Sequence, residues 1–365
     1  MSGIYVHVPF CHAKCAYCDF YSLADTRRRR AFVDRVGQEY AARVDELGSS
    51  PVRTIYFGGG TPSILPADDF ELLAAFFPKN EVKEFTIEVN PEDVTPEAVA
   101  AWRSAGVNRV SMGVQSLVDG ELAVVRRRHS AADALQAIDT IRAGGIANLS
   151  VDLIYGLPGQ TPETFQYSLD SLLAKGVEHL SAYNLSFEEG TLLTRMLREG
   201  RVAEVSEDMI VEMYARLCTA TRRAGLEHYE ISNFGLPGFH SRHNSAYWDG
   251  TPYLGLGPGA HSLDCRGVRR FNSPDLRGYL VGASAIIDEE DETDVWNDRI
   301  ITALRTARGL DLDSLPRHYA ESVRAAARPF IATGDLVVKS GRLTIPENKW
   351  LISNYLMSEL LVSED

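Results

Sequence analysis

Six short apolar runs alternate with amphipathic stretches across the first half of this 365-residue sequence. Each run has the length and the bounding turn residues of a buried strand, while apolar residues recur with helical spacing in the stretches between them. Strands that alternate with helices predict a parallel sheet with helices packed outside it. We therefore predict an α/β fold built on a partial (β/α)6 TIM-type barrel. The predicted strands are 4–8, 54–57, 84–89, 109–114, 149–154 and 180–185.

Start signals place helices between these strands. Thr95 and Thr161 are each followed by proline and glutamate, which supply an N-cap, a favoured first helical residue and an acid in the first turn. Four arginines at 27–30 are expected to form the solvated start of the first helix. The predicted helices span 29–45, 67–76, 96–104, 131–143 and 162–173.

The pattern changes twice beyond residue 200. A helix is predicted at 206–224, and the dense glycine, proline, histidine and aromatic residues of 229–259 predict long structured loops. From about 294 the order is helix, helix, β-ribbon and helix, which is typical of a small α+β, winged-helix-like domain. We predict a barrel at 1–200, a linking segment at 201–290 and a C-terminal winged-helix-like domain at 291–365.

The charge balance limits the partners. The chain has 37 Lys and Arg against 50 Asp and Glu, a net charge of −13, so nucleic acid is not an expected partner. Apolar stretches of about 18 residues are absent, so no membrane span is predicted. The N-terminus lacks the charged and apolar regions of a signal peptide, and we expect a cytoplasmic location.

Three of the five cysteines crowd into one loop, at Cys11, Cys15 and Cys18. An odd, clustered set of cysteines predicts a metal site in a reducing compartment. Three thiolates on a [4Fe–4S] cluster leave one iron open, and an open iron can chelate S-adenosylmethionine (SAM). A zinc or redox group is the alternative, although zinc sites usually have four ligands. Cys218 is expected to be buried among apolar residues, and Cys265 remains open as a remote fourth thiolate.

Polar motifs follow successive predicted strands. Gly58–Pro62 follows the second strand, while Glu88, Gln115 and Asp152 end the third, fourth and fifth. The carboxyl ends of parallel barrel strands meet at one mouth, where active sites of this fold lie. We therefore expect these groups to surround one common ligand.

The stretch 5–20 resembles the signature of the oxygen-independent coproporphyrinogen III oxidase-like radical SAM family. Further motifs at 57–63, 88–91, 111–116, 152–161 and 229–248 extend the resemblance over nearly the whole chain. It implies that Cys11, Cys15 and Cys18 are the cluster ligands. The SAM contacts that it implies are Tyr5, Tyr17, Gly59, Gly60, Thr61, Glu88, Gln115, Arg127 and Asp152.

Part of this set matches a second SAM site of the catalytic oxidase. Those positions are Thr61, Gln115, Arg127 and Asp152. Arg126 occupies the position where the family has glycine, so the segment around Arg127 departs from the family pattern.

Two departures resemble the heme-chaperone branch of that family instead. The fourth cysteine of the catalytic oxidase is Phe20 here, and only four residues precede Tyr5. The branch also carries an HNxxYW motif, which here is His243-Asn-Ser-Ala-Tyr247-Trp248. An imidazole or a phenol can ligate heme iron, and an indole offers the porphyrin a flat apolar face. His243, Tyr247 and Trp248 are therefore the candidate heme contacts, with His240 and His261 as competing ligands.

The resemblance implies a heme chaperone that binds heme and passes it to an acceptor hemoprotein. Heme, the heme-accepting protein and an electron donor for the cluster are the expected partners, and an exposed cluster edge is compatible with a homodimer. The alternative is the oxidase reaction itself, a radical SAM oxidative decarboxylation of coproporphyrinogen III, which Phe20 disfavours. Radical chemistry on an unrelated substrate is a third option. No catalytic residue is assigned.

Overall fold

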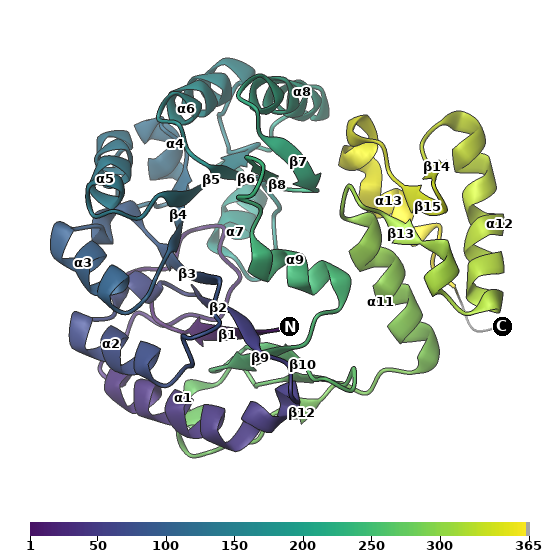
Figure 1. Cartoon of the computed structure of the whole chain (residues 1–365). Coiled ribbons are helices and arrows are strands. Elements are labelled where there is room, and N and C mark those ends of the chain that lie inside the picture. Colours follow the sequence, from purple (N-terminus) through teal and green to yellow (C-terminus); the bar gives the residue numbers. More distant parts are fainter. Residues whose placement is uncertain (363–365) are drawn as a thin grey trace.

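The computed structural model describes residues 1–362 and contains the predicted barrel (Figure 1). Six parallel strands lie side by side in chain order, and their register places the carboxyl ends together at one mouth. All six predicted strands are confirmed, each within two residues at either end. They are β1 (Ser2–Val8), β2 (Val52–Gly59), β3 (Glu84–Val89), β4 (Arg109–Gln115), β5 (Asn148–Tyr155) and β6 (His179–Asn184).

Helices cover the outside of these strands, as Figure 1 shows. The predicted caps are present, because Thr95 accepts a hydrogen bond from the Ala98 N–H and Thr161 from the Thr164 N–H. The arginine run does lie at the start of a helix, and Arg29 pairs with Asp69 there. The outer helices are α1 (Arg29–Arg43), α2 (Ala67–Ala75), α3 (Pro96–Ser104), α4 (Asp119–Val124), α5 (Ala131–Ala143), α6 (Pro162–Ala174) and α8 (Glu207–Arg223).

The chain beyond residue 200 adds strands at both edges of the sheet. β9 (Tyr253–Leu256) pairs in parallel with β1, and β8 (Asn233–Gly235) pairs antiparallel with β6. The prediction of long loops at 229–259 was therefore wrong. Strands of three or four residues carry no clear periodicity of their own, and their pairing comes from a distant edge of the sheet. The other elements here are α7 (Leu192–Arg198), β7 (Glu227–Glu230), α9 (Arg242–Asp249), β10 (His261–Leu263), β11 (Arg269–Phe271), α10 (Leu276–Leu280) and β12 (Ile286–Ile287).

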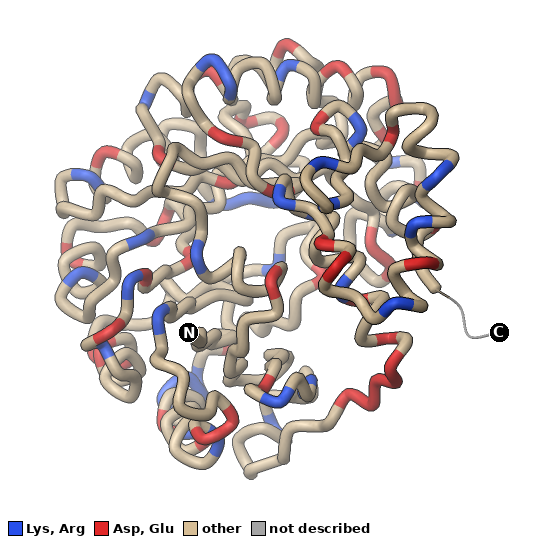
Figure 2. The backbone as a smooth tube through the Cα atoms, turned by 45° about the vertical axis from the view of Figure 1, so that its right-hand side comes forward, with Lys and Arg blue, Asp and Glu red and all other residues tan. Residues whose placement is uncertain are grey.

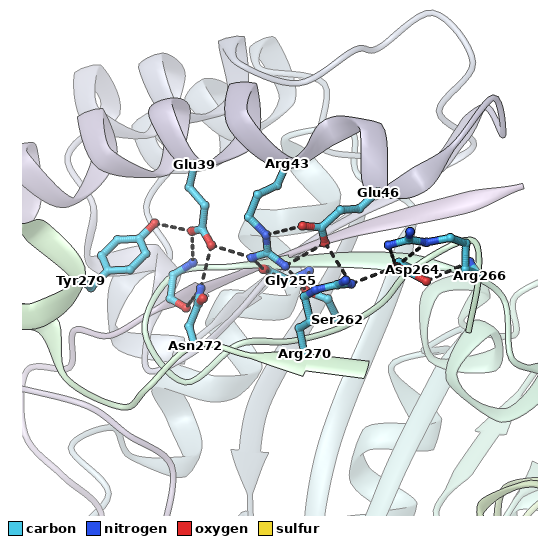
Figure 3. A network of polar contacts seen from close by, with 11 residues as sticks. Glu39, Arg43, Glu46, Gly255, Ser262, Asp264, Arg266, Arg270, Asn272 and Tyr279 are labelled. Atoms are coloured by element: carbon cyan, nitrogen blue, oxygen red, sulfur yellow. Dashed lines mark hydrogen bonds and ion pairs between the residues drawn. The ribbon is translucent and has the colours of Figure 1, made fainter. Parts of the chain in front are cut away.

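A buried polar network holds the β9–β11 edge against α1 (Figure 3). The Glu39 carboxylate accepts hydrogen bonds from the Tyr279 hydroxyl at 2.7 Å, the Asn272 amide at 2.8 Å and the Arg43 guanidinium at 2.7 Å. Arg43 also donates to Glu46 at 3.0 Å. A buried charge is tolerated when it is paired and hydrogen-bonded, as this one is. The network therefore fixes the added edge in register with the barrel.

The C-terminal segment stands beside the barrel, next to β7 and α9 (Figure 1). Its order of helix, strand, helix and β-ribbon agrees with the predicted winged-helix-like α+β fold. The domain limits at 200 and 290 stay predictions, and residues 363–365 lie outside the described part. The elements are α11 (Glu292–Leu304), β13 (Leu310–Asp311), α12 (Arg317–Thr333), β14 (Val337–Lys339), β15 (Arg342–Thr344), η5 (Glu347–Ile352) and α13 (Ser353–Ser358).

Acidic and basic residues are interspersed along the chain over most of the molecule (Figure 2). Among residues 1–362, no helix combines the length and the apolar composition that crossing a membrane requires.

Candidate functional site

The carboxyl ends of the parallel strands surround a cavity of about 440 Å³. Its wall contains the three clustered cysteines and eight of the nine predicted SAM contacts. The ninth, Tyr5, lies deeper in the barrel, with its hydroxyl 3.4 Å from His7 Nδ1. The eight lining contacts are Tyr17, Gly59, Gly60, Thr61, Glu88, Gln115, Arg127 and Asp152.

The loop after β1 presents Cys11, Cys15 and Cys18, all as partly exposed free thiols. The Thr61 hydroxyl donates to Cys11 Sγ at 3.2 Å, and Arg127 lies 3.5 Å from Cys15 Sγ. Burial raises the pKa of the Cys11 thiol and raises that of Cys18 to about 11. Thiols in such a setting become thiolates when a cation takes the place of the proton. Three free thiols that converge in one loop at the cavity fit an iron–sulfur cluster.

The glycine triplet lets β2 approach the cysteine loop. A Cβ at Gly60 would lie 2.6 Å from the Phe10 carbonyl oxygen and 2.7 Å from that of Val8. Gly59 has a φ of 96°, a conformation that favours glycine, and its N–H donates to Glu88 at 3.1 Å. The glycines are therefore required by the close contact between two backbone segments.

Two buried carboxyl groups face the cavity. Burial raises the pKa of Glu88 to about 7 and that of Asp152 to about 6. The Tyr56 hydroxyl donates to Glu88 at 2.8 Å, and the Ser111 hydroxyl donates to Asp152 at 3.3 Å. Carboxylates that are costly to ionise in isolation bind an ammonium or several hydroxyl donors favourably. The pair suits the amino group and the ribose of a SAM molecule.

Arg127 connects the cysteine loop to the strand ends. Its guanidinium donates to Asn90 Oδ1 at 2.8 Å and to the Gly113 carbonyl, and Asn90 in turn donates to Thr61 at 3.3 Å. The Nε atom of Arg127 is buried without a hydrogen-bond partner in the described structure, which leaves a donor for an anionic ligand group. Arg126 has a φ of 59°, which explains why glycine is the family residue there.

Further residues of this site were not predicted from the sequence, among them Asn90, Tyr56 and Ser111. Asn90 was visible as the third residue of the Glu88-Val-Asn-Pro motif, but a single amide carries no chemical signal by itself. Tyr56 lies on β2 with its hydroxyl on Glu88, and only the strand pairing of β2 and β3 reveals that contact.

The HNxxYW motif lies at the opposite end of the barrel from the cysteines. It forms α9, whose first N–H groups, those of Arg242 and His243, donate to the carboxylate of Glu84 at 2.9 and 3.0 Å. Glu84 is the first residue of β3, so the start of α9 lies at the amino ends of the strands. The motif was expected in a loop, and it forms a helix that covers this end of the barrel.

The His243 side chain is enclosed. It is 1% exposed, its ring stacks on Tyr56 with 5.1 Å between centroids, and burial lowers its pKa to about 3. Nδ1 lies 2.8 Å from Thr54 Oγ1, and Nε2 lies 2.8 Å from the Tyr247 hydroxyl. Trp248 lies apart from this pair and stacks against Arg305. Both imidazole nitrogens are therefore engaged within the protein.

The remaining candidates also have definite places. His240 pairs with Glu227 at 2.9 Å and stacks on Tyr229, and His261 stacks on Phe271. Cys218 is buried, as predicted. The Cys265 N–H donates to the Glu46 carbonyl before the start of β2, far from the cavity at the strands' carboxyl ends. A fourth thiolate from Cys265 is excluded by this position.

Comparison with known proteins agrees with the site. Residues 5–172 match the Radical SAM superfamily, and membership implies a [4Fe–4S] cluster and SAM. The heme chaperone HemW of Mycobacterium tuberculosis is 33% identical over 98% of this chain and 94% of its own. HemW of Lactococcus lactis is 36% identical over 77% of this chain and 74% of its own.

A solved structure shares the whole architecture. Coproporphyrinogen III oxidase (HemN) from Escherichia coli matches 99% of this chain and 90% of its own with a TM-score of 0.83, at 22% sequence identity. This likeness shows the fold, while the sequence relatives show the branch. The chain therefore belongs to the HemW branch of the coproporphyrinogen III oxidase-like radical SAM family.

Proposed function

We propose that this chain is a heme chaperone, which binds heme and passes it to an acceptor hemoprotein. The observation that carries the proposal is the 33% identity over 98% of the chain with a protein named a heme chaperone. Phe20 supports it, because this side chain lines the cavity and is 62% exposed at the position where the oxidase has a fourth cysteine. An aromatic side chain there cannot replace that thiol.

The same proposal assigns the cofactors to the cavity. Cys11, Cys15 and Cys18 would hold the [4Fe–4S] cluster, and the unpartnered Nε of Arg127 offers a donor to the SAM carboxylate. Glu88 and Asp152 would accept from its ammonium and ribose hydroxyls. A reduced cluster held by these thiolates would be able to supply an electron to the bound SAM.

Heme is proposed at the opposite end, near α9. A cavity of about 510 Å³ there is lined by Arg53, Lys83, Arg242 and His240, among others, so heme propionates would meet cationic side chains. Ligation of iron by His243 requires α9 to move, because both ring nitrogens are hydrogen-bonded. His240 lines the cavity directly and is the competing ligand. Tyr247 and Trp248 would contact the porphyrin once α9 has moved.

Hemin titration tests this assignment. We expect saturable binding by the full chain, weakened at least tenfold by the substitution at the true ligand, either His243→Ala or His240→Ala. His318→Ala, at an exposed position on α12, is the matched control and should bind as the parent does. Absence of saturable hemin binding by the parent would refute the proposed function. Formation of protoporphyrinogen IX from coproporphyrinogen III in an anaerobic assay would favour the oxidase instead.

An electron donor for the cluster is proposed to dock beside the cysteine loop. A third cavity, of about 560 Å³, includes Cys15 and Cys18 in its lining together with Lys14, Arg126 and Arg195. These cations suit an acidic redox protein. The homodimer and the cytoplasmic location stay predictions.

A further inference from the structure

Three side chains of metal-ligand type converge between the barrel and the C-terminal segment. They are Cys218 on α8, His228 on β7 and Glu347 at the start of η5. One ligand atom from each lies within 4.8 Å of the other two. Cys218 and His228 lie on consecutive elements, whereas Glu347 is 119 residues beyond His228, so only the packing of η5 against α8 and β7 brings Glu347 to the other two. The cluster is remote from the cysteine loop and plays no part in the proposed function.

The histidine is oriented as metal-bound histidines usually are. His228 Nδ1 faces the cluster, 3.0 Å from Glu347 Oε1, while Nε2 lies 3.5 Å from the Ile231 carbonyl oxygen. A ligating imidazole commonly donates its other N–H to a carbonyl or carboxylate, which fixes the ring. Phe234 stacks on the same ring at 3.9 Å between centroids, and Trp350 meets its edge at 4.2 Å.

The other two groups are also held in place. Arg222, one turn beyond Cys218 on α8, pairs with the second oxygen of Glu347. The Tyr214 hydroxyl donates to the Glu347 carbonyl at 3.1 Å, which ties η5 to α8. Burial raises the pKa of Cys218 to about 11, the opposite of what a nucleophilic cysteine needs. This cluster is therefore a poor candidate for a catalytic triad.

We propose that Cys218, His228 and Glu347 bind a divalent transition metal of the zinc class and thereby clamp the C-terminal segment to the barrel. One sulfur, one nitrogen and one carboxylate oxygen are a donor set that Zn²⁺ accepts, and a water molecule completes a tetrahedral site. Binding releases the thiol proton to solvent. A cavity of about 470 Å³ that His228, Glu347 and Trp350 help to line provides the route of entry.

Cobalt(II) is the probe for this site, because a cobalt–thiolate bond gives a near-ultraviolet charge-transfer band. The full chain would carry serine at Cys11, Cys15 and Cys18, so that only Cys218 and Cys265 can supply a thiolate. We expect one equivalent of Co²⁺ to bind with that band. The band should disappear with Cys218→Ser and persist with Cys265→Ser, which is the matched control because Cys265 is exposed.

Glu347→Gln is the second test variant, because the Glu347 side chain is 36% exposed and its replacement should leave the fold intact even if Cys218→Ser does not fold. We expect it to keep the circular dichroism spectrum and to weaken Co²⁺ binding at least tenfold. In the cluster-loaded wild-type chain, dialysis against Zn²⁺ should leave one zinc per chain in addition to the iron. Absence of saturable Co²⁺ binding, or equal affinity in the parent and in Glu347→Gln, would overturn the proposal.

Discussion

Replacing Glu88 by glutamine should make the cluster-free protein more stable at alkaline pH while it weakens SAM binding. The Glu88 carboxyl is buried at the cavity, and burial raises its pKa to about 7 from an ordinary value of 4.5. A carboxyl whose pKa is raised on folding costs stability once it ionises, and the cost grows as pH rises from 4.5 through 7. Glutamine carries no charge and escapes this cost.

The magnitude follows from the two pKa values. A difference between about 7 and 4.5 corresponds to about 3 kcal/mol when the group is fully ionised, near pH 8, and to about 1 kcal/mol at pH 5. The Glu88→Gln variant can keep both hydrogen bonds that the Glu88 carboxylate makes with Gly59 and Tyr56. The amide oxygen can accept from the Gly59 N–H, and the Tyr56 hydroxyl can reverse to accept from the amide nitrogen.

Urea denaturation of the cluster-free chain at pH 5 and pH 8, followed by circular dichroism, measures the effect. We expect Glu88→Gln to gain about 2 kcal/mol more at pH 8 than at pH 5. Glu71→Gln, at an exposed position on α2, should show no such difference. SAM affinity of the cluster-loaded chain should fall roughly thirtyfold, for a lost charge-assisted contact of about 2 kcal/mol. An equal stability change at both pH values would refute the reasoning.

Three further changes test other parts of the fold. Gly60→Ala places a Cβ against the Phe10 carbonyl and should lower the free energy of unfolding by about 1–3 kcal/mol. It should also lower the amount of iron bound after reconstitution. Gly120→Ala, at a position in open space, should have neither effect. Arg126→Gly removes left-handed strain and should raise the unfolding free energy by about 0.5–1 kcal/mol in urea; a loss would contradict the strain argument. Burial lowers the pKa of His243 to about 3, so the free energy of unfolding should fall as pH drops below 6.5, where the unfolded imidazole takes up a proton. His243→Asn should make unfolding less dependent on pH in that range. An unchanged pH profile would contradict this role of His243.

Local pattern was sufficient to predict most of the barrel. Buried parallel strands are nearly continuous apolar runs, and N-cap residues mark the first turn of a helix. The predicted strand starts at Glu84 and Arg109 therefore agree with the structure. So do the predicted helix starts at Pro96 and Pro162. The cavity wall was predicted for a related reason. Parallel strands bring their carboxyl ends to one mouth, so residues at successive strand ends become neighbours without further information.

The sequence by itself therefore determined the barrel, the cysteine loop and those polar groups around the cavity that end successive strands. Only the tertiary structure decided which groups meet across distant elements. It stacked His243 on Tyr56 at the end of the barrel that α9 covers, and it brought Glu347 to Cys218 and His228. These contacts depend on the pairing of short edge strands and on the docking of the C-terminal segment, and neither leaves a periodic signal in a single chain.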